Sequence, residues 1–219
     1  MIEELLPVGV VSVHTFGDRL ETPLFPEEEA VIARAVAKRR VEFTTVRACA
    51  REALAKLGYP PAPLLPGERG APGWPDGVVG SMTHCAGYRA ATVARVGDVA
   101  ALGIDAEPDA PVPEGVLEAI ARPEDLTAMA ALPAGGPAWD RVLFSAKESV
   151  YKAWFPLARR FLDFQEASVA ILADGTFEAR ILVPGPELLG RPLTGFSGRW
   201  MAKGGLVLTA IAVEGAGEG

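Results

Sequence analysis

The sequence predicts an α+β protein in which two α+β halves pack together in a single chain. A strand pattern, a long helical stretch and three strand patterns fill the first half, and helical patterns followed by four strand patterns fill the second. Helices and strands grouped in this way are typical of α+β proteins. With 219 residues, the chain is long enough for either one large domain or two smaller ones to bury a core. We place the boundary between the halves, residues 1–108 and 109–219, directly after Pro108.

The elements of the first half follow from local patterns. Residues 8–13 are typical of a strand, and residues 26–57 of a helix with Pro26 in its first turn and Gly58 as its stop. The run Thr44-Thr45-Val46 indicates a break within that helix. Residues 60–77 contain six prolines and four glycines and therefore predict an irregular surface loop. Strand patterns follow at residues 78–83, 89–96 and 99–104.

The second half repeats the order loosely. Helical patterns cover residues 114–120, 123–132 and 138–155. Strand patterns then occupy residues 167–173, 176–183, 197–202 and 205–213. Asp174 and Gly175 predict a tight hairpin turn between the first two of these strands. We find no residue-level repeat that relates the two halves.

Composition narrows the possible functions. Apolar residues make up 49% of the chain and charged residues 22%, which is typical of a folded globular protein. The net charge of −7 argues against nucleic-acid binding by the surface as a whole. Glu3 and Glu4 precede the first apolar stretch, where a signal peptide would carry basic residues, and no apolar run could span a bilayer. We therefore expect a cytoplasmic protein with no membrane contact, in which Cys49 and Cys85 are free thiols.

Two carboxylates follow the strand pattern at residues 99–104. Asp105 and Glu107 are spaced i, i+2, so both point from the same face of the strand, which Pro108 then stops. Two solvated acids at a strand end are the simpler interpretation of such a pair. The apolar residues before Asp105 favour a second interpretation, in which the pair lies at the edge of a core and binds a ligand.

A third carboxylate lies in the helical pattern at residues 138–155. Glu148 and Lys152 are spaced i, i+4, which by itself describes an ordinary surface salt bridge. Their neighbours are largely apolar, however, and buried charges need partners. A metal-bound phosphate would satisfy Lys147, Glu148 and Lys152 together. Since three carboxylates suit a hard cation such as Mg²⁺, with Mn²⁺ as an alternative, metal-assisted chemistry on a phosphate ester is the leading hypothesis.

Basic residues gather on one helical stretch of this otherwise acidic chain. Arg39 and Arg47 are eight residues apart and share a helix face. Such a cluster is usually a solvated face, but arginine side chains also match the geometry of phosphate oxygens. His84 follows a strand end of small residues, which lets a ligand approach the backbone. A single histidine in such a place is more often structural than a ligand contact.

Taken together, these segments resemble the Sfp-type 4′-phosphopantetheinyl transferases, in particular an actinobacterial-like branch. The resemblance spans residues 8–160, and the ordered combination is more specific than any single motif. The matching segments are Lys38-Arg39-Arg40-Val-Glu-Phe-Thr-Thr-Val-Arg47, the segment 74–88 around His84, Gly103-Ile-Asp105-Ala-Glu107 and Phe144-Ser-Ala-Lys147-Glu148-Ser-Val-Tyr-Lys152. Family members of this length fold as a pseudo-twofold pair of α+β halves with the site between them.

The resemblance implies roles for individual residues. Asp105, Glu107 and Glu148 match the family's Mg²⁺ ligands, and Asp105, Glu148 and Lys152 match its catalytic residues. Glu148 also matches the residue proposed to deprotonate the acceptor serine, but we rank its metal role first because a tight ligand is a hindered base. The residues implied to hold coenzyme A or to line its pocket are Arg39, Arg47, Arg69, Ser81, Met82, Thr83, His84, Lys147 and Lys152. Arg69 stands where many relatives carry lysine.

The implied activity is transfer of the 4′-phosphopantetheine arm of coenzyme A to a serine of apo acyl or peptidyl carrier proteins, with release of 3′,5′-ADP. The expected carriers belong to polyketide, nonribosomal peptide or fatty-acid synthases, and residues 109–137, including Leu126 and Met129, could dock them. The two internal halves predict that a monomer suffices. Two alternatives remain: a metal-dependent nucleotide phosphohydrolase and a coenzyme A-binding module without catalytic activity.

Overall fold

The computed structural model of the chain describes residues 1–217 and confirms the predicted α+β class. The helices are α1 (Pro26–Val31), α2 (Ala37–Lys56), α3 (Val116–Ile120), α4 (Pro123–Ala130) and α5 (Trp139–Ala158), and the 3-10 turns are η1 (Ile2–Leu5), η2 (Glu68–Gly70) and η3 (Phe164–Glu166). The strands are β1 (Val11–Thr15), β2 (Val78–Cys85), β3 (Tyr88–Arg95), β4 (Val99–Pro108), β5 (Ala167–Ile171), β6 (Thr176–Ile181), β7 (Glu187–Leu188), β8 (Arg191–Pro192), β9 (Gly195–Lys203) and β10 (Leu206–Glu214).

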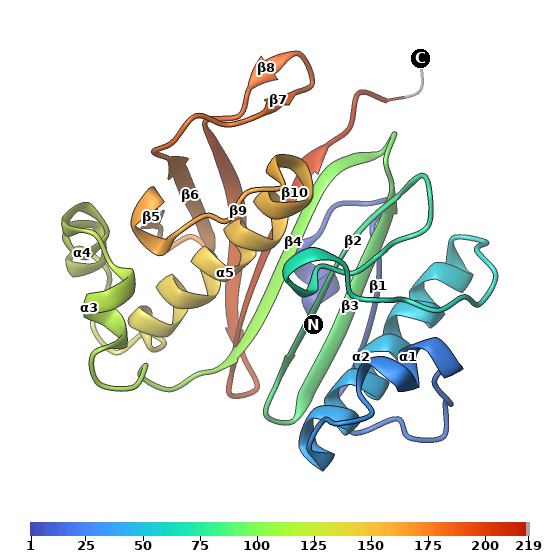
Figure 1. The fold of residues 1–219 in the computed structure, drawn as a ribbon. Helices are drawn as coiled ribbons and strands as arrows, with labels where there is room; N and C mark the ends of the chain where they lie inside the picture. Colours follow the sequence, from blue (N-terminus) through green and yellow to red (C-terminus); the bar gives the residue numbers. More distant parts are fainter. Residues whose placement is uncertain (218–219) are drawn as a thin grey trace.

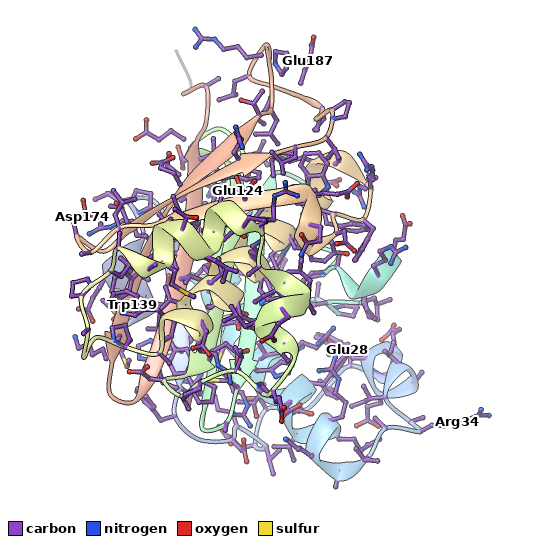
Figure 2. The ribbon with its side chains drawn as sticks, turned by 90° about the vertical axis from the view of Figure 1, so that its left-hand side faces the viewer. Glu28, Arg34, Glu124, Trp139, Asp174 and Glu187 are labelled. Carbon is purple, nitrogen blue, oxygen red and sulfur yellow. The ribbon has the colours of Figure 1, made fainter. Side chains whose placement is uncertain are left out.

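The strands form two main sheets, each with one long helix packed against it (Figure 1). A three-stranded sheet has the order β1-β3-β2, and α2 packs against it. A five-stranded sheet has the order β4-β10-β9-β6-β5, and α5 lies across β4 and β10. Strands β7 and β8 form a small separate hairpin. Figure 2 shows Glu187 on this hairpin and Asp174 at the predicted turn between β5 and β6. None of the helices in residues 1–217 is long and apolar enough to cross a membrane.

Several element boundaries differ from the sequence prediction. The helix expected at residues 26–57 is two helices, and the break lies at residues 32–36 rather than at Thr44-Thr45-Val46, which α2 passes through without interruption. Arg40 stabilises this break because its Nη1 donates to the carbonyl oxygen of Ile32 at 2.9 Å. Strand β4 continues to Pro108, so Asp105 and Glu107 lie within the strand and not beyond it. The β7–β8 hairpin was not predicted, since strands of two residues carry no periodic signal.

Strand β4 joins the two halves. Although it precedes the expected boundary at residue 108, it pairs along its length with β10 of the five-stranded sheet. Its other edge faces β2, with which it shares no backbone ladder. Instead, the Ser81 hydroxyl accepts the N–H of Ile104 at 3.0 Å, and the Thr83 hydroxyl accepts the N–H of Ala106 at 3.1 Å. The two sheets therefore meet through side-chain hydroxyls, and both hydroxyls satisfy buried donors that would otherwise lack partners.

Helix α5 approaches β4 closely because residue 103 is glycine. A Cβ at Gly103 would overlap the carbonyl oxygen of Ser149 and lie 2.9 Å from the backbone nitrogen of Ala153. The apolar side of α5 is buried with the inner face of the five-stranded sheet, and Trp154 is its largest fully buried residue. This close approach brings the polar residues of α5 within reach of the carboxylates on β4.

Lys147 anchors the other side of α5. Its Nζ donates to the carbonyl oxygens of Ile120, Phe164 and Ala167 at 2.8–2.9 Å and lies 2.7 Å from the Asp125 carboxylate. The Lys147 side chain is only 2% exposed, and burial lowers its pKa. Lys147 was expected to bind coenzyme A, whereas its ammonium here has all of its partners within the second half of the fold.

We predict that Gly103→Ala destabilises the protein by about 1–3 kcal/mol, because the added methyl group forces α5 away from β4. Denaturant unfolding followed by circular dichroism measures the change. Gly17→Ala is the matched control, since no atom lies within 4 Å of a Cβ built there. Equal unfolding midpoints for the two variants would contradict the role assigned to Gly103.

Lys147→Met should lower the free energy of unfolding by about 3–5 kcal/mol, because it leaves the buried Asp125 carboxylate without its cation. The same denaturant titration tests this expectation. Lys56→Met serves as the control, because the Lys56 side chain is 53% exposed and its pair with Glu52 should contribute at most about 1 kcal/mol. A loss no larger than that of the control would show that the Lys147 anchor is dispensable.

Candidate functional site

One face of α5 carries a polar stripe that is directed at β4. Arg141, Ser145, Glu148 and Lys152 follow one another at i, i+4, i+7 and i+11, so they line a single side of the helix. Arg141, Ser145 and Lys152 contact the carboxylates of β4, as described below. The stripe and the carboxylates together form a charged seam between the helix and the strand.

Asp105 lies at the centre of this seam and is buried. Its Oδ1 accepts hydrogen bonds from Lys152 Nζ at 2.7 Å and from the Thr83 hydroxyl at 3.2 Å. Its Oδ2 accepts the Ser145 hydroxyl at 2.9 Å, and Ser145 lies 2.9 Å from the Thr209 hydroxyl of β10. Lys152 also donates to the carbonyl oxygen of Ile104 at 3.1 Å. The buried charge of Asp105 is therefore balanced by an ammonium and two hydroxyls.

Glu107 lies on the same face of β4, two residues along. Its carboxylate pairs with Arg141 Nη1 at 3.0 Å. Arg141 also donates to the carbonyl oxygens of Ala110 and Pro111, which holds the chain where it leaves β4. Burial raises the pKa of Glu107, the charge of Asp105 raises it further, and Arg141 opposes both effects. Glu107 thus has one side-chain partner, Arg141, whereas Asp105 has three.

Glu148 is half-buried on α5, close enough to Asp105 and Lys152 for their charges to act on it. Burial is the main reason that the pKa of Glu148 is raised, and Asp105 adds to the effect while Lys152 opposes it. Within residues 1–217, no three His, Cys, Asp or Glu side chains are gathered as a metal ion would require. The carboxylates of Asp105 and Glu107 are instead paired with Lys152 and Arg141. The donor chemistry fits a hard cation, but these pairs would have to open to receive one.

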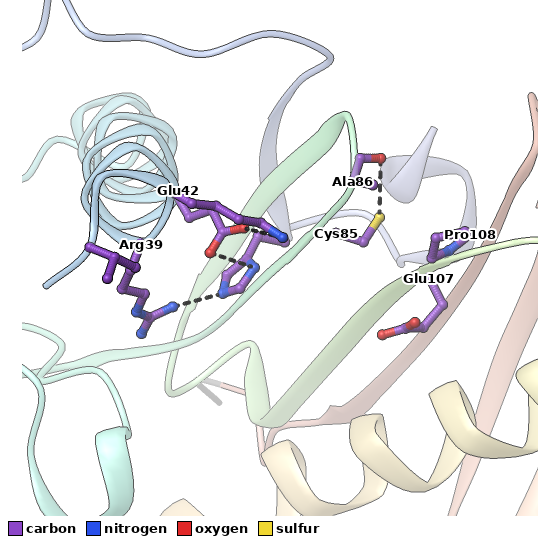
Figure 3. A pocket seen from close by; sticks show the side chains of 9 residues that line it. Arg39, Glu42, Cys85, Ala86, Glu107 and Pro108 are labelled. Carbon is purple, nitrogen blue, oxygen red and sulfur yellow. Dashed lines mark hydrogen bonds and ion pairs between the residues drawn. The ribbon is translucent and has the colours of Figure 1, made fainter. Parts of the chain in front are cut away.

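A cleft of about 450 Å³ lies beside this seam, between the start of α2, the end of β2 and the end of β4 (Figure 3). Its lining residues are Val36, Lys38, Arg39, Glu42, His84, Cys85, Ala86, Glu107 and Pro108. Arg39 Nη1 lies 3.0 Å from His84 Nε2, and Glu42 lies 3.9 Å from His84 Nδ1. The cleft therefore combines basic side chains with Glu107, which it shares with the seam.

Arg47 does not line the cleft, although it was expected to bind phosphate with Arg39. Its Nε donates to the carbonyl oxygen of Leu64 at 2.9 Å, and its guanidinium packs over the ring of Phe43. Burial lowers the pKa of Arg47 to about 10, an effect that nearby Glu28 opposes. Glu28, which lies on α1 (Figure 2), also accepts two hydrogen bonds from Arg51. Arg47 thus joins α2 to the loop that follows it, and Arg51 joins α2 to α1.

The other expected pocket residues are placed differently. Ser81 and Thr83 are buried, and their hydroxyls are used in the junction between β2 and β4. Met82 points to the opposite side of β2, where it packs against the core under α2. Arg69 lies in the loop before β2 with its guanidinium 4.9 Å from the centre of the Phe161 ring. Of the residues expected to hold the nucleotide, the cleft lining therefore includes Arg39 and His84.

Sequence reasoning missed Glu42, Arg141 and Ser145. Glu42 lies one turn after Arg39 on α2, and Arg141 and Ser145 precede Glu148 by seven and three residues on α5. The sequence could therefore have indicated these residues, because each lies at a helical spacing from a residue already identified. Thr209, which bonds to Ser145 and Ser149, gave no such signal because it lies in an apolar strand far along the chain.

Comparison with known proteins gives a consistent result across the chain. Residues 27–94 match a model of the 4′-phosphopantetheinyl transferase N-terminal domain, and residues 101–200 match the 4′-phosphopantetheinyl transferase superfamily. The 4′-phosphopantetheinyl transferase Svp of Streptomyces mobaraensis is 60% identical, over 97% of this chain and 89% of its own. PptT of Mycobacterium tuberculosis is 54% identical, over 88% of this chain and 86% of its own. Npt of Nocardia iowensis is 48% identical, over 97% of this chain and 99% of its own. The chain therefore belongs to the 4′-phosphopantetheinyl transferase superfamily.

Proposed function

We propose that this 4′-phosphopantetheinyl transferase binds the nucleotide of coenzyme A in the cleft beside α2 and performs the transfer at the seam between β4 and α5. As a member of its family, the chain transfers phosphopantetheine from coenzyme A to carrier proteins. The observation that carries the proposal is the position of Glu107. It lines the cleft, and it lies two residues from Asp105 on one strand face. A pyrophosphate that leads out of the cleft would reach the seam at this point.

Asp105, Glu107 and Glu148 would hold a Mg²⁺ ion at the seam, with Mn²⁺ as an alternative. The support is the oxygen donor set and the raised pKa of Glu107 and Glu148, which indicates carboxylates in need of a counter-charge. When bound, the ion would supply charge neutralisation for a pyrophosphate. Arg141 pairs with Glu107 and Lys152 with Asp105. If the metal took their place, both cations would be free to contact the phosphates.

The transfer forms one bond and breaks one. The serine oxygen of the carrier attacks the β-phosphorus of coenzyme A, and the bond from that phosphorus to the bridging oxygen breaks, so that 3′,5′-ADP leaves with the bond's electron pair. The serine proton passes to Glu148, directly or through a water molecule. Lys152 stays beside the transferred phosphoryl group and offsets its charge, since positioning and electrostatics dominate this kind of catalysis.

Arg39 and His84 would hold phosphate groups of the nucleotide, including the 3′-phosphate, with Lys38 at the rim of the same cleft. Arg69 would reach the nucleotide only by leaving the Phe161 ring. The carriers would be those of polyketide, nonribosomal peptide or fatty-acid synthases in the cytoplasm, and a monomer would suffice. Leu126 of α4 is exposed and Met129 is half-buried, so this helix offers some apolar surface for a carrier.

Incubation with coenzyme A, Mg²⁺ and an apo carrier protein should add one phosphopantetheine arm to the carrier, read as an increase in intact mass. Chelation of the metal and the variants Asp105→Ala and Glu148→Gln should each lower the rate by at least about 100-fold, as expected for loss of charge stabilisation. Lys56→Met, far from the seam, should retain the wild-type rate.

The same assay separates the alternatives. Phosphate release from nucleotides without carrier modification would favour the hydrolase, and coenzyme A binding without either product would favour the non-catalytic module. Full activity after chelation would overturn the metal site and leave the family assignment intact.

Glu148→Gln should also stabilise the metal-free protein at pH 7 while it abolishes transfer. Burial raises the pKa of folded Glu148 above its ordinary 4.5, so the wild type loses stability as pH rises from 4.5 through the folded pKa. Glutamine resembles the neutral acid and avoids this loss. Unfolding midpoints at pH 4.5 and pH 7 measure the difference, with the exposed Glu118→Gln as control. A variant less stable than wild type at pH 7 would contradict this account.

A further inference from the structure

The cleft contains a histidine held between groups of opposite charge. Arg39 and Glu42 lie one turn apart on α2 (Figure 3), and the ring of His84, at the end of β2, lies close to both. The two ring nitrogens have different neighbours: Nε2 lies 3.0 Å from Arg39 Nη1, and Nδ1 lies 3.9 Å from Glu42 Oε2. Lys38 lies 4.0 Å from the other oxygen of Glu42.

These neighbours determine where His84 carries its proton. A guanidinium only donates hydrogen bonds, so the Nε2 atom beside Arg39 must be the acceptor. The proton of the neutral ring is then on Nδ1, which faces the Glu42 carboxylate. Before a ligand binds, the imidazole is therefore neutral, and its lone pair points into the contact with Arg39.

A phosphate group cannot bind to this arrangement without a change. Its oxygens accept hydrogen bonds, so a phosphate between Arg39 and His84 needs a proton on Nε2. Moving the proton from Nδ1 to Nε2 would turn a lone pair toward the Glu42 carboxylate, which is unfavourable. Adding a second proton instead gives an imidazolium, whose Nδ1 can donate toward Glu42 and whose Nε2 can donate to the phosphate. The presence of Glu42 therefore favours proton uptake over a change of tautomer.

We propose that Glu42 is a positioning residue that couples binding of a phosphate monoester in this cleft to uptake of one proton by His84. The proposal rests on the proposed function, in which the 3′-phosphate of coenzyme A is that monoester. Before binding, burial is the main cause that lowers the pKa of His84, while Glu42 opposes it. The dianionic phosphate would add a second opposing charge and so favour the imidazolium.

The other charges around His84 act in the expected directions. Arg39 on α2, Arg89 on β3 and Lys152 on α5 lower its pKa, and Glu42 is the acidic group that raises it. Lys38 and Glu107 lie in the cleft lining as well. Because burial and the basic groups together outweigh Glu42, the free protein keeps His84 neutral near pH 7, and a proton can be taken up on binding.

Isothermal titration calorimetry at pH 7.5 in two buffers of different ionisation enthalpy counts the protons. At this pH a phosphate monoester, with a second pKa near 6, is already almost fully dianionic, so the count reports on the protein. We expect coenzyme A to bind wild-type protein with uptake of about 0.5–1 proton, and its affinity to fall by up to about tenfold per pH unit above that pH. Dephospho-coenzyme A, which lacks the 3′-phosphate, should take up almost none.

Variants separate the coupling from the binding itself. Glu42→Gln should bind coenzyme A with less than half of the wild-type proton uptake and a flatter pH dependence, and His84→Gln should show none. Glu52→Gln is the matched control on α2, because Glu52 pairs with Arg19 and Lys56 outside the cleft. Coenzyme A binding with no proton uptake, or equal uptake with dephospho-coenzyme A or in Glu42→Gln, would overturn this inference alone. Failure of coenzyme A to bind would overturn the proposed function and the inference with it.

Discussion

The site depends on a single buried carboxylate that three elements share. Asp105 of β4 accepts hydrogen bonds from Thr83 of β2 and from Ser145 and Lys152 of α5. A buried charge without partners would be strongly destabilising, so these bonds fix how the helix and both strands lie relative to one another. Gly103, two residues before Asp105, lets the helix come near enough for these bonds to form. The packing of the fold and the arrangement of the charged groups thus have the same origin.

The acidic residues of the seam differ because their surroundings differ. Asp105 is fully engaged by an ammonium and hydroxyls, whereas Glu107 has one guanidinium partner and Glu148 is desolvated beside a like charge. Carboxylates in different surroundings can hold different roles in one reaction. Asp105 is suited to fix charge in place, and Glu148 is suited to exchange a proton or a cation.

The sequence predicted the fold class, most strands, the position of Asp105 and Glu107 at the end of a strand and that of Glu148 on a helix, because these depend on local periodicity and on short motifs. It did not show which side of a helix or strand each polar residue faces. Lys147 and Glu148 are neighbours in the chain, yet one is buried against Asp125 and the other lies at the seam. Arg39 and Arg47 share a nominal helix face, but the loop after α2 covers only the second through its bond to Leu64. Such distinctions arise from tertiary packing, which spacing along one element cannot reveal.

The junction between β2 and β4 has a further consequence. Because Ser81 and Thr83 join the strands through hydroxyl groups, the two sheets are not bound by a continuous backbone ladder. The angle between them can differ among homologous chains without loss of backbone pairing in either sheet. Since His84 lies on β2 and Glu107 on β4, that angle also sets the distance between these two residues across the cleft. A few side chains at this joint therefore set the width of the cleft, while both cores stay unchanged.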